Sequence, residues 1–128
     1  MSRVVYVIDG TKISNVQDFY ELAGQAVGGS DYYFGTDLDS FSDCLSGGFG
    51  TPEDDDFEFR IQSSDATRES LGYAETLRWR IAQRARVHPA NRVIWDGYIS
   101  DARHRRGQTV FDILVEIFAS RGVTLRLE

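Results

Sequence analysis

The chain has 128 residues, a length that suits one ordinary domain and is too short for two domains with separate cores. Hydrophobic residues make up 41% of the chain and charged residues 27%, a globular composition that argues against disorder. No apolar run approaches the ~20 residues that a membrane-spanning helix needs. The single cysteine, Cys44, excludes an internal disulfide and indicates a reduced protein, which we expect in the cytoplasm.

Charge is distributed unevenly along the chain, whose formal net charge is −6 at pH 7. Residues 1–64 contain 12 acidic and 3 basic side chains, whereas residues 65–128 contain 8 acidic and 11 basic ones. An acidic surface repels the phosphates of nucleic acids and attracts cationic groups. The first half of the chain therefore favours a basic protein as its partner and disfavours direct binding of nucleic acid.

The first predicted element is a strand over residues 4–8, a continuous apolar run of the kind that is buried on both faces of a sheet. The acidic Asp9 after this run argues against an export signal. A helix follows, which Ser14 or Asn15 caps and which the glycines at 28–29 end.

A short second helix is predicted over residues 37–46, with Gly47-Gly48 as its stop and an inner face formed by Leu38, Phe41 and Leu45. Residues 51–56 are predicted to form a loop rich in acidic side chains. Residues 57–62 then alternate between apolar and polar side chains, which predicts a strand.

A longer helix is predicted from Ser64-Asp65 to about Arg86, with His88-Pro89 as its stop and with Leu71, Ala74, Leu77, Ile81 and Ala85 facing inward. Residues 92–95 fit either a short strand or a buried extended loop, and residues 101–106 are polar and exposed. A capping box of Thr109 and Asp112 opens the last helix, Gly122 closes it, and residues 123–127 form a final strand.

Strands that are separated by helices pair in parallel through right-handed crossovers. We therefore expect one α/β domain over residues 1–128, three-layer-like, with a parallel sheet of about three strands packed with about four helices plus an inserted helix.

The segment 32–48 carries the strongest functional signal. Aromatic residues precede Gly35, and a short helix then presents Asp39 and Asp43 four residues apart on one face. Like charges at this spacing destabilise an isolated helix by ~0.2–0.5 kcal/mol. A cationic ligand or partner would neutralise the pair, and the alternative is a solvated acidic helix face.

This segment resembles the inhibitory segment of the barstar family, intracellular inhibitors of the secreted ribonuclease barnase, in Gly35-Thr-Asp-Leu-Asp39 and Phe41-Ser-Asp43-Cys-Leu45. The resemblance covers residues 3–62 and 107–128, and residues 64–106 look like an insertion relative to the type protein. It implies the barstar fold and an immunity-type inhibitor without catalysis or cofactor. It also implies a basic ribonuclease or nuclease toxin as the partner, bound by a monomer in a 1:1 complex.

The resemblance also assigns roles to residues of the segment. Asp39 and Asp43 would replace the substrate phosphates in the nuclease, held by charge-assisted hydrogen bonds, and Tyr33 and Phe34 would be aromatic contacts. Cys44 and the inner leucines would belong to the core. The full partner-binding set that it implies is Tyr33, Phe34, Gly35, Asp37, Asp39, Ser42, Asp43, Ser46 and Gly47.

Three positions depart from the family pattern. Asp37 stands where the family often has Asn, Ser42 stands where an aromatic contact is expected, and Ile117 stands where an interface Glu is expected. Loss of an aromatic side chain removes contact area of the kind that dominates interfaces. These departures leave the identity of the target nuclease open.

Two alternative functions are compatible with the acidic pair. One is a small Mg²⁺-dependent hydrolase or phosphotransfer enzyme that uses Asp39 and Asp43; the other is an immunity protein for a toxin that is not a nuclease. Calcium binding of the EF-hand type is disfavoured, because Ser42 and Gly48 stand where such a loop needs Gly and Glu. We expect no bound metal.

The remaining motifs have structural explanations. Trp79 and Trp95 are expected to pack in the core or within the insertion rather than to stack on a ligand. We expect an exposed helix face formed by Arg78, Arg80 and Arg84.

Overall fold

The computed structural model describes residues 3–29, 32–47, 50–52 and 56–128. Within these ranges, three strands form a parallel sheet in the order β1 (Val4–Asp9), β2 (Phe57–Gln62) and β3 (Thr124–Leu127). The helices of the same ranges are α1 (Val16–Gly28), α2 (Leu38–Leu45), α3 (Ser64–Ser70), α4 (Tyr73–Arg84), α5 (Arg92–Arg103), α6 (Val110–Ser120) and the 3₁₀ turns η1 (Gly10–Lys12) and η2 (Pro89–Asn91). The predicted α/β class with a three-stranded parallel sheet is confirmed.

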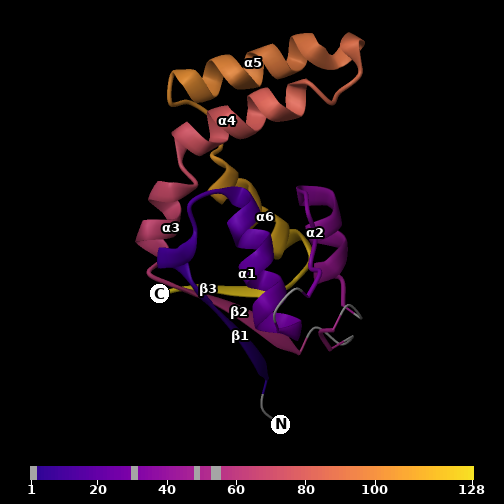
Figure 1. Cartoon of the computed structure of the whole chain (residues 1–128), viewed down its shortest axis with the longest axis vertical. Coiled ribbons are helices and arrows are strands. Elements are labelled where there is room, and N and C mark those ends of the chain that lie inside the picture. Colours follow the sequence, from indigo (N-terminus) through magenta and orange to yellow (C-terminus); the bar gives the residue numbers. More distant parts are fainter. Residues whose placement is uncertain (1–2, 30–31, 48–49, 53–55) are drawn as a thin grey trace.

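The elements lie in successive layers (Figure 1). The sheet forms one layer, α1, α2 and α6 lie over one of its faces, and the hairpin of α4 and α5 lies beyond these helices. None of the helices in the described part of the chain is long and apolar enough to cross a membrane. The predicted stop at Gly48 and most of the acidic loop, residues 53–55, lie outside the described residues.

The core is an aromatic cluster between the sheet and the covering helices. Phe41 of α2 lies at its centre, with ring centroids 5.3 Å from Phe19, 5.8 Å from Phe34 and 5.6 Å from Phe118. Phe59 of β2 reaches the same cluster, 5.4 Å from Phe118. The helical spacing and the strand alternation in the first half of the sequence thus predicted the buried faces of α1, α2 and β2 correctly.

The strand at the N-terminus is not buried on both faces, and that prediction is wrong. Tyr6 and Ile8 face the helices and are buried, whereas Val4, Val5 and Val7 are exposed. The reason is topological, because β1 is an edge strand of a sheet whose helices cover one face.

The opposite face of the sheet carries a cluster of charged side chains. Glu58 of β2 is buried beneath three arginines, with N–O distances of 2.9 Å to Arg60, 2.9 Å to Arg126 and 3.9 Å to Arg3. The hydrogen bond from Arg60, together with the nearby cations, lowers the pKa of Glu58. This cluster covers the face that the helices leave open.

Helix caps follow the sequence signals closely. The Asn15 side chain accepts a hydrogen bond from the Asp18 amide at 2.9 Å, so Asn15 rather than Ser14 is the cap of α1. Thr109 and Asp112 form the predicted capping box of α6, with hydrogen bonds of 3.1 Å and 3.0 Å.

The helix predicted from Ser64 to Arg86 is in fact two helices. The chain breaks at Leu71 and Gly72, where Leu71 turns fully into the core and its carbonyl accepts a hydrogen bond from the Phe111 amide at 3.3 Å. The predicted inward face is therefore wrong for α4: Ala74, Ile81 and Ala85 are exposed and Leu77 is half-buried. The residues that α4 buries are Glu75, Thr76 and Trp79.

Residues 92–95 are neither a strand nor an extended loop, because they begin α5. Val93 and Ile94, which made this stretch look like a strand, lie on the outer side of α5 and are exposed. The predicted single inserted helix is thus part of a helical hairpin, in which α5 packs on α4.

Polar contacts attach the hairpin to the rest of the protein. Glu75 accepts a hydrogen bond from the Val16 amide at 2.8 Å, and Thr76 accepts one from the Val110 amide at 2.9 Å. Both contacts satisfy amide groups at the first turns of α1 and α6, which have no partner within their own helices. The hairpin therefore caps α1 and α6, two of the helices that cover the sheet.

The side chains of α4 also organise the interior of the hairpin. The rings of Trp79 and Trp95 meet at 6.2 Å, which confirms that both pack within the insertion. The predicted exposed arginine face is confirmed for Arg78, which is exposed and pairs with Glu75 at 2.5 Å, and is wrong for Arg84, which is half-buried and pairs with Asp96 at 2.6 Å. Arg80 is half-buried, and this burial lowers its pKa.

Candidate functional site

The first turn of α2 is fixed by a reciprocal cap. The Asp37 carboxylate accepts a hydrogen bond from the Ser40 amide at 2.7 Å, and Ser40 Oγ accepts from the amides of Asp37 at 3.1 Å and Thr36 at 2.9 Å. These hydrogen bonds from Ser40 lower the pKa of Asp37. This cap sets the orientation of the residues that follow it in α2.

The inner face of α2 anchors the helix in the core. Phe41, Cys44 and Leu45 are buried, as the sequence predicted. Burial, with a smaller effect of Asp43, raises the pKa of the Cys44 thiol, which therefore stays protonated at neutral pH. The helix is thus held from beneath, and its outer face is available for contacts.

The outer face of α2 carries the acidic pair. Asp39 is exposed and has no ion-pair partner within 4.0 Å among the described residues, while the Asp43 side chain is 73% exposed. Arg121, at the end of α6, donates hydrogen bonds to Ser42 Oγ at 2.8 Å and to Asp43 Oδ1 at 3.3 Å. Two predicted site residues therefore share an internal cation, which the sequence gave no local signal to find.

The two aromatic residues before Gly35 have different environments. Tyr33 is 56% exposed and can contact a partner. Phe34 is 1% exposed and packs against Phe41 and Phe59, with ring centroids 5.8 Å and 5.9 Å away. Phe34 therefore supports the segment from beneath and presents no side-chain surface to a partner, contrary to the role that the resemblance implied.

Gly35 is required by a close approach of backbone to backbone. Its φ is +100°, and a Cβ at this position would lie 2.7 Å from the backbone nitrogen and Cα of Phe41. The glycine lets the segment before α2 lie directly against the helix. At the other end of α2, Ser46 is exposed, and Gly47 is half-buried with a φ of +101°.

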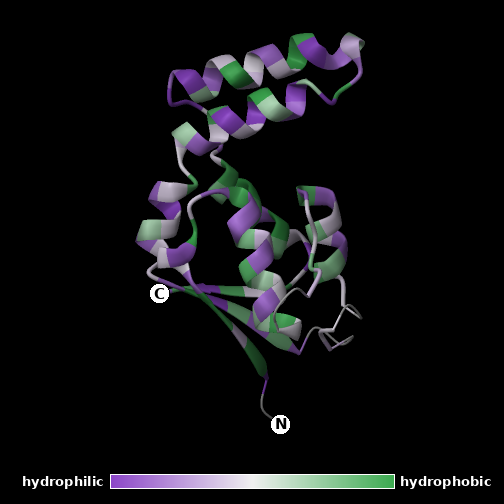
Figure 2. Cartoon of the chain, viewed as in Figure 1, coloured by the Kyte–Doolittle hydropathy of each residue, from purple (hydrophilic) through white to green (hydrophobic). Residues whose placement is uncertain are grey.

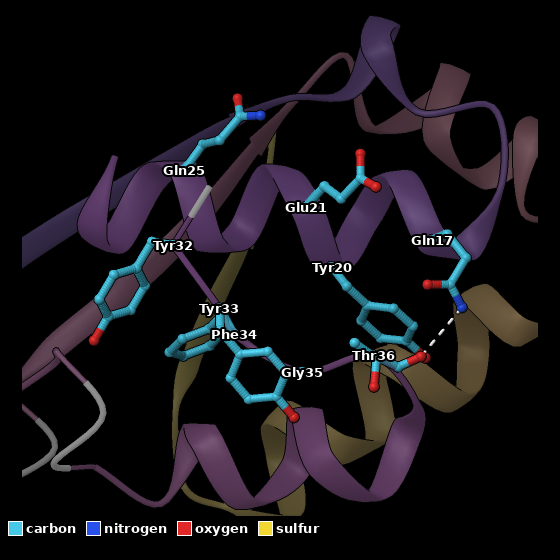
Figure 3. A pocket seen from close by; sticks show the side chains of 9 residues that line it. All are labelled: Gln17, Tyr20, Glu21, Gln25, Tyr32, Tyr33, Phe34, Gly35 and Thr36. Atoms are coloured by element: carbon cyan, nitrogen blue, oxygen red, sulfur yellow. Dashed lines mark hydrogen bonds between the residues drawn. The ribbon is translucent and has the colours of Figure 1, made fainter. Parts of the chain in front are cut away.

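A cleft of about 350 Å³ lies beside this segment, between α1 and residues 32–36 (Figure 3). Gln17 crosses one end of it and donates a hydrogen bond to the Thr36 carbonyl at 3.1 Å. Tyr20 lines the cleft, and its buried hydroxyl has no hydrogen-bond partner among the described residues. Burial, assisted by the charges of Asp37 and Asp39, raises the pKa of Tyr20.

A second hollow separates the start of α2 from the hairpin. This groove of about 250 Å³ is lined on the α2 side by Asp37, Leu38 and Asp39 and on the hairpin side by Trp79, Gln83 and Trp95. We call it the α2–hairpin groove. Sequence reasoning missed it, because its two walls are about forty residues apart in the chain.

The arrangement can present fixed negative charge to a cationic surface. Asp37, Asp39 and Asp43 follow one another along a short helix whose cap and inner face are both immobilised. Within the described residues, no three or more His, Cys, Asp and Glu side chains gather closely enough to hold a metal ion. The site is thus an acidic ridge flanked by Tyr33 on one side and by the hairpin on the other.

Comparison with known proteins agrees with this geometry. A family model described as Barstar (barnase inhibitor) matches residues 3–88, which include the whole acidic segment. The match also runs through residues 64–88, part of the stretch that the resemblance identifies as an insertion, and it ends before residues 107–128. Searches of curated proteins and of solved structures found no match.

Proposed function

The chain belongs to the barstar family, and we propose that it is an intracellular inhibitor of a basic ribonuclease whose active site it blocks with the outer face of α2. The observation that carries the proposal is the acidic pair itself. Asp39 and Asp43 project from a helix that is capped by Asp37 and anchored by three buried side chains, so the backbone that carries both carboxylates is held before any partner arrives. Such preorganisation reduces the entropy lost on binding.

The proposed mechanism is mimicry of the substrate. A ribonuclease binds the phosphates of RNA with Arg, Lys or His groups, and the two carboxylates would occupy those positions. Hydrogen bonds between guanidinium groups and carboxylates are short and strong, particularly when water is excluded. The exposed ring of Tyr33, which precedes the helix that carries the acidic pair, would help to exclude water.

Arg121 has a part in this mechanism. Its guanidinium contacts Oδ1 of Asp43, which restricts the rotation of that carboxylate, and a cation of the nuclease would bind Oδ2. We propose Asp43 as the main contact and Asp39 as the weaker one, because Asp39 lies nearer the exposed start of the helix. Asp37, Ser42, Ser46 and Gly47 complete the proposed contact surface.

The partner that we propose is a basic ribonuclease or nuclease toxin of the same cell, bound as a 1:1 complex in the cytoplasm. The acidic first half of the chain supports this choice, because its charge favours encounter with a cationic protein and opposes encounter with RNA. The inhibitor would then protect the cell that produces the nuclease.

The test titrates the purified chain into barnase, and into the ribonuclease activity that its native host secretes, while RNA cleavage is followed. We expect stoichiometric inhibition of at least one enzyme. Asp43→Ala should weaken binding by ~2–5 kcal/mol, mainly through faster dissociation, because it leaves the cations of the nuclease unpaired. Asp39→Ala should weaken it less.

Asp65→Ala is the matched control, since Asp65 is fully exposed on α3 and its nearest cation is Arg68 at 3.8 Å. This variant removes the same charge and should leave dissociation unchanged. The proposal is wrong if neither enzyme is inhibited, or if Asp43→Ala inhibits as tightly as the unmodified chain. Phosphate-ester cleavage that needs Mg²⁺ and disappears in both α2 variants would show an enzyme instead.

A further inference from the structure

The α2–hairpin groove lies directly beside the acidic ridge. The two share Asp37 and Asp39, which line one wall of the groove, so a protein that covers α2 also reaches the groove. In Figure 1 the hairpin projects from the body of the molecule on the side of the helices, away from the sheet. The position of the hairpin therefore places it at the margin of the proposed interface.

The chemistry of the two walls fits a cationic side chain. Asp39 supplies an exposed carboxylate without an ion-pair partner among the described residues. The charge of Asp37 is partly balanced by Arg86, which lines an adjoining cavity together with Asp37 and Gln83. The other wall is lined by Trp79, of which 8% is exposed, by Gln83 and by Trp95, and a guanidinium or ammonium group is attracted both to carboxylates and to indole rings.

The same rings already bind one guanidinium group within the chain. The Cζ atom of Arg80 lies 4.6 Å from the ring centre of Trp79 and 5.3 Å from that of Trp95. Arg80 lines a separate cleft, with Tyr98 and Asp101, and is not among the residues that line the α2–hairpin groove.

We infer that the α4–α5 hairpin is a second contact arm for the ribonuclease, and that the α2–hairpin groove receives a Lys or Arg side chain of that enzyme. The inference rests on the proposed function. It assigns a role in binding to Trp79, Gln83 and Trp95, which lie on the hairpin and outside the α2 segment that resembles the barstar family. The indoles then serve two purposes, since they pack the hairpin and form one wall of the groove.

Charge substitution at Gln83 tests the inference without removing a core side chain. Gln83 lies near the end of α4, where a cation is favourable to the helix, so Gln83→Lys should fold normally. We expect Gln83→Lys to weaken ribonuclease binding about tenfold or more and Gln83→Glu to strengthen it about threefold, because the added charge lies inside the groove. Ala85→Lys is the matched control, because Ala85 is exposed beyond the same helix end and does not line the groove. The affinity of Ala85→Lys for the ribonuclease should stay within about twofold of that of the unmodified chain at physiological salt.

The probe is the enzyme inhibited in the titration above, and calorimetry gives the affinity of each variant. With the ¹⁵N-labelled chain, the indole N–H signals of Trp79 and Trp95 should shift when the unlabelled enzyme is added. Equal affinities of Gln83→Lys and Ala85→Lys, with unshifted indole signals, would overturn the inference. If Asp43→Ala still weakens binding in that case, the proposed function stands. If the unmodified chain inhibits neither enzyme, both the proposed function and this inference are wrong.

Discussion

The body of the molecule and its hairpin are stabilised in different ways. In the body, the sheet and α1, α2 and α6 enclose an aromatic cluster centred on Phe41. The hairpin joins this body through hydrogen bonds of Glu75 and Thr76 and through Trp79, which belongs to the buried core cluster and packs against Trp95. Figure 2 shows the same contrast, since α6 is hydrophobic along much of its length whereas α4 and α5 mix hydrophilic and hydrophobic residues.

This difference predicts in which region each kind of substitution should cost the most stability. Loss of apolar volume should be most costly in the body, because close-packed interiors relax only partly around a cavity. Loss of a buried hydrogen-bond partner should be most costly where the hairpin meets the body. The following predictions test this division.

Removal of the central aromatic ring should have the largest effect. Phe41→Ala should lower the free energy of unfolding by ~3–5 kcal/mol, because the ring contacts Phe19, Phe34 and Phe118 and is fully buried. Urea denaturation followed by circular dichroism measures the change. A loss below about 1 kcal/mol would show that the cluster does not determine the stability of the body.

Removal of the carboxylate that joins the hairpin to α1 should have the next largest effect. Glu75→Ala should cost ~1–3 kcal/mol, because the Val16 amide loses its acceptor and Arg78 loses its ion-pair partner. Glu75→Gln should cost less, since its amide oxygen still accepts from Val16. Glu69→Ala, on the exposed surface of α3, is the control and should change stability by less than ~0.5 kcal/mol. Equal losses for Glu75→Ala and Glu69→Ala would refute a structural role of this junction.

The cap of α2 should make stability depend on pH. Folding lowers the pKa of Asp37, so its ionised form stabilises the fold above the unfolded pKa of ~3.9, and this contribution is lost as pH falls through the folded pKa. Asp37→Asn keeps a cap but does not titrate, and near neutral pH it should be less stable by ~0.3–1 kcal/mol.

The measurement is a series of urea midpoints from neutral pH to below pH 3. The difference between the unmodified chain and Asp37→Asn should shrink as the pH falls below about 4. Asp37→Ala, which removes the cap at every pH, should cost ~1 kcal/mol near neutral pH. A constant difference across the series would mean that the carboxylate charge contributes nothing to the cap.

Truncation on the outer side of the hairpin should have the smallest effect. Val93 is 73% exposed, so Val93→Ala should change the free energy of unfolding by less than ~0.5 kcal/mol. Val110, at the start of α6, is fully buried, and the same substitution there should cost ~1.5–3 kcal/mol. Similar losses at the two positions would show that α5 is covered in solution.

Local signals in the sequence predicted the body well. The predicted caps at Asn15 and Thr109 form hydrogen bonds within three residues, so neighbouring side chains suffice to recognise them. Alternation in β2 and helical spacing in α1 identified the buried faces, because each of these elements has one face against the core. The acidic pair on α2 was found in the same way.

The same reasoning failed where burial has no simple period. In α4 the buried positions include Glu75 and Thr76, whose polar atoms serve the first turns of other helices, so an apolar pattern could not mark them. In α5 the apolar residues Val93 and Ile94 face outward, although their apolar pattern suggested a buried strand. At β1 the sequence could not reveal that the strand lies at an edge.

The sequence by itself determined the α/β class, the position of α2 and the presence of Asp39 and Asp43 on one face. These features depend on residues that are close in the chain. Only the tertiary structure decided that Phe34 is buried, that Arg121 reaches Asp43 and that two tryptophans of the hairpin face the start of α2. Each of these contacts joins distant segments, and chain folding, which is driven by burial of the aromatic cluster, sets their distances.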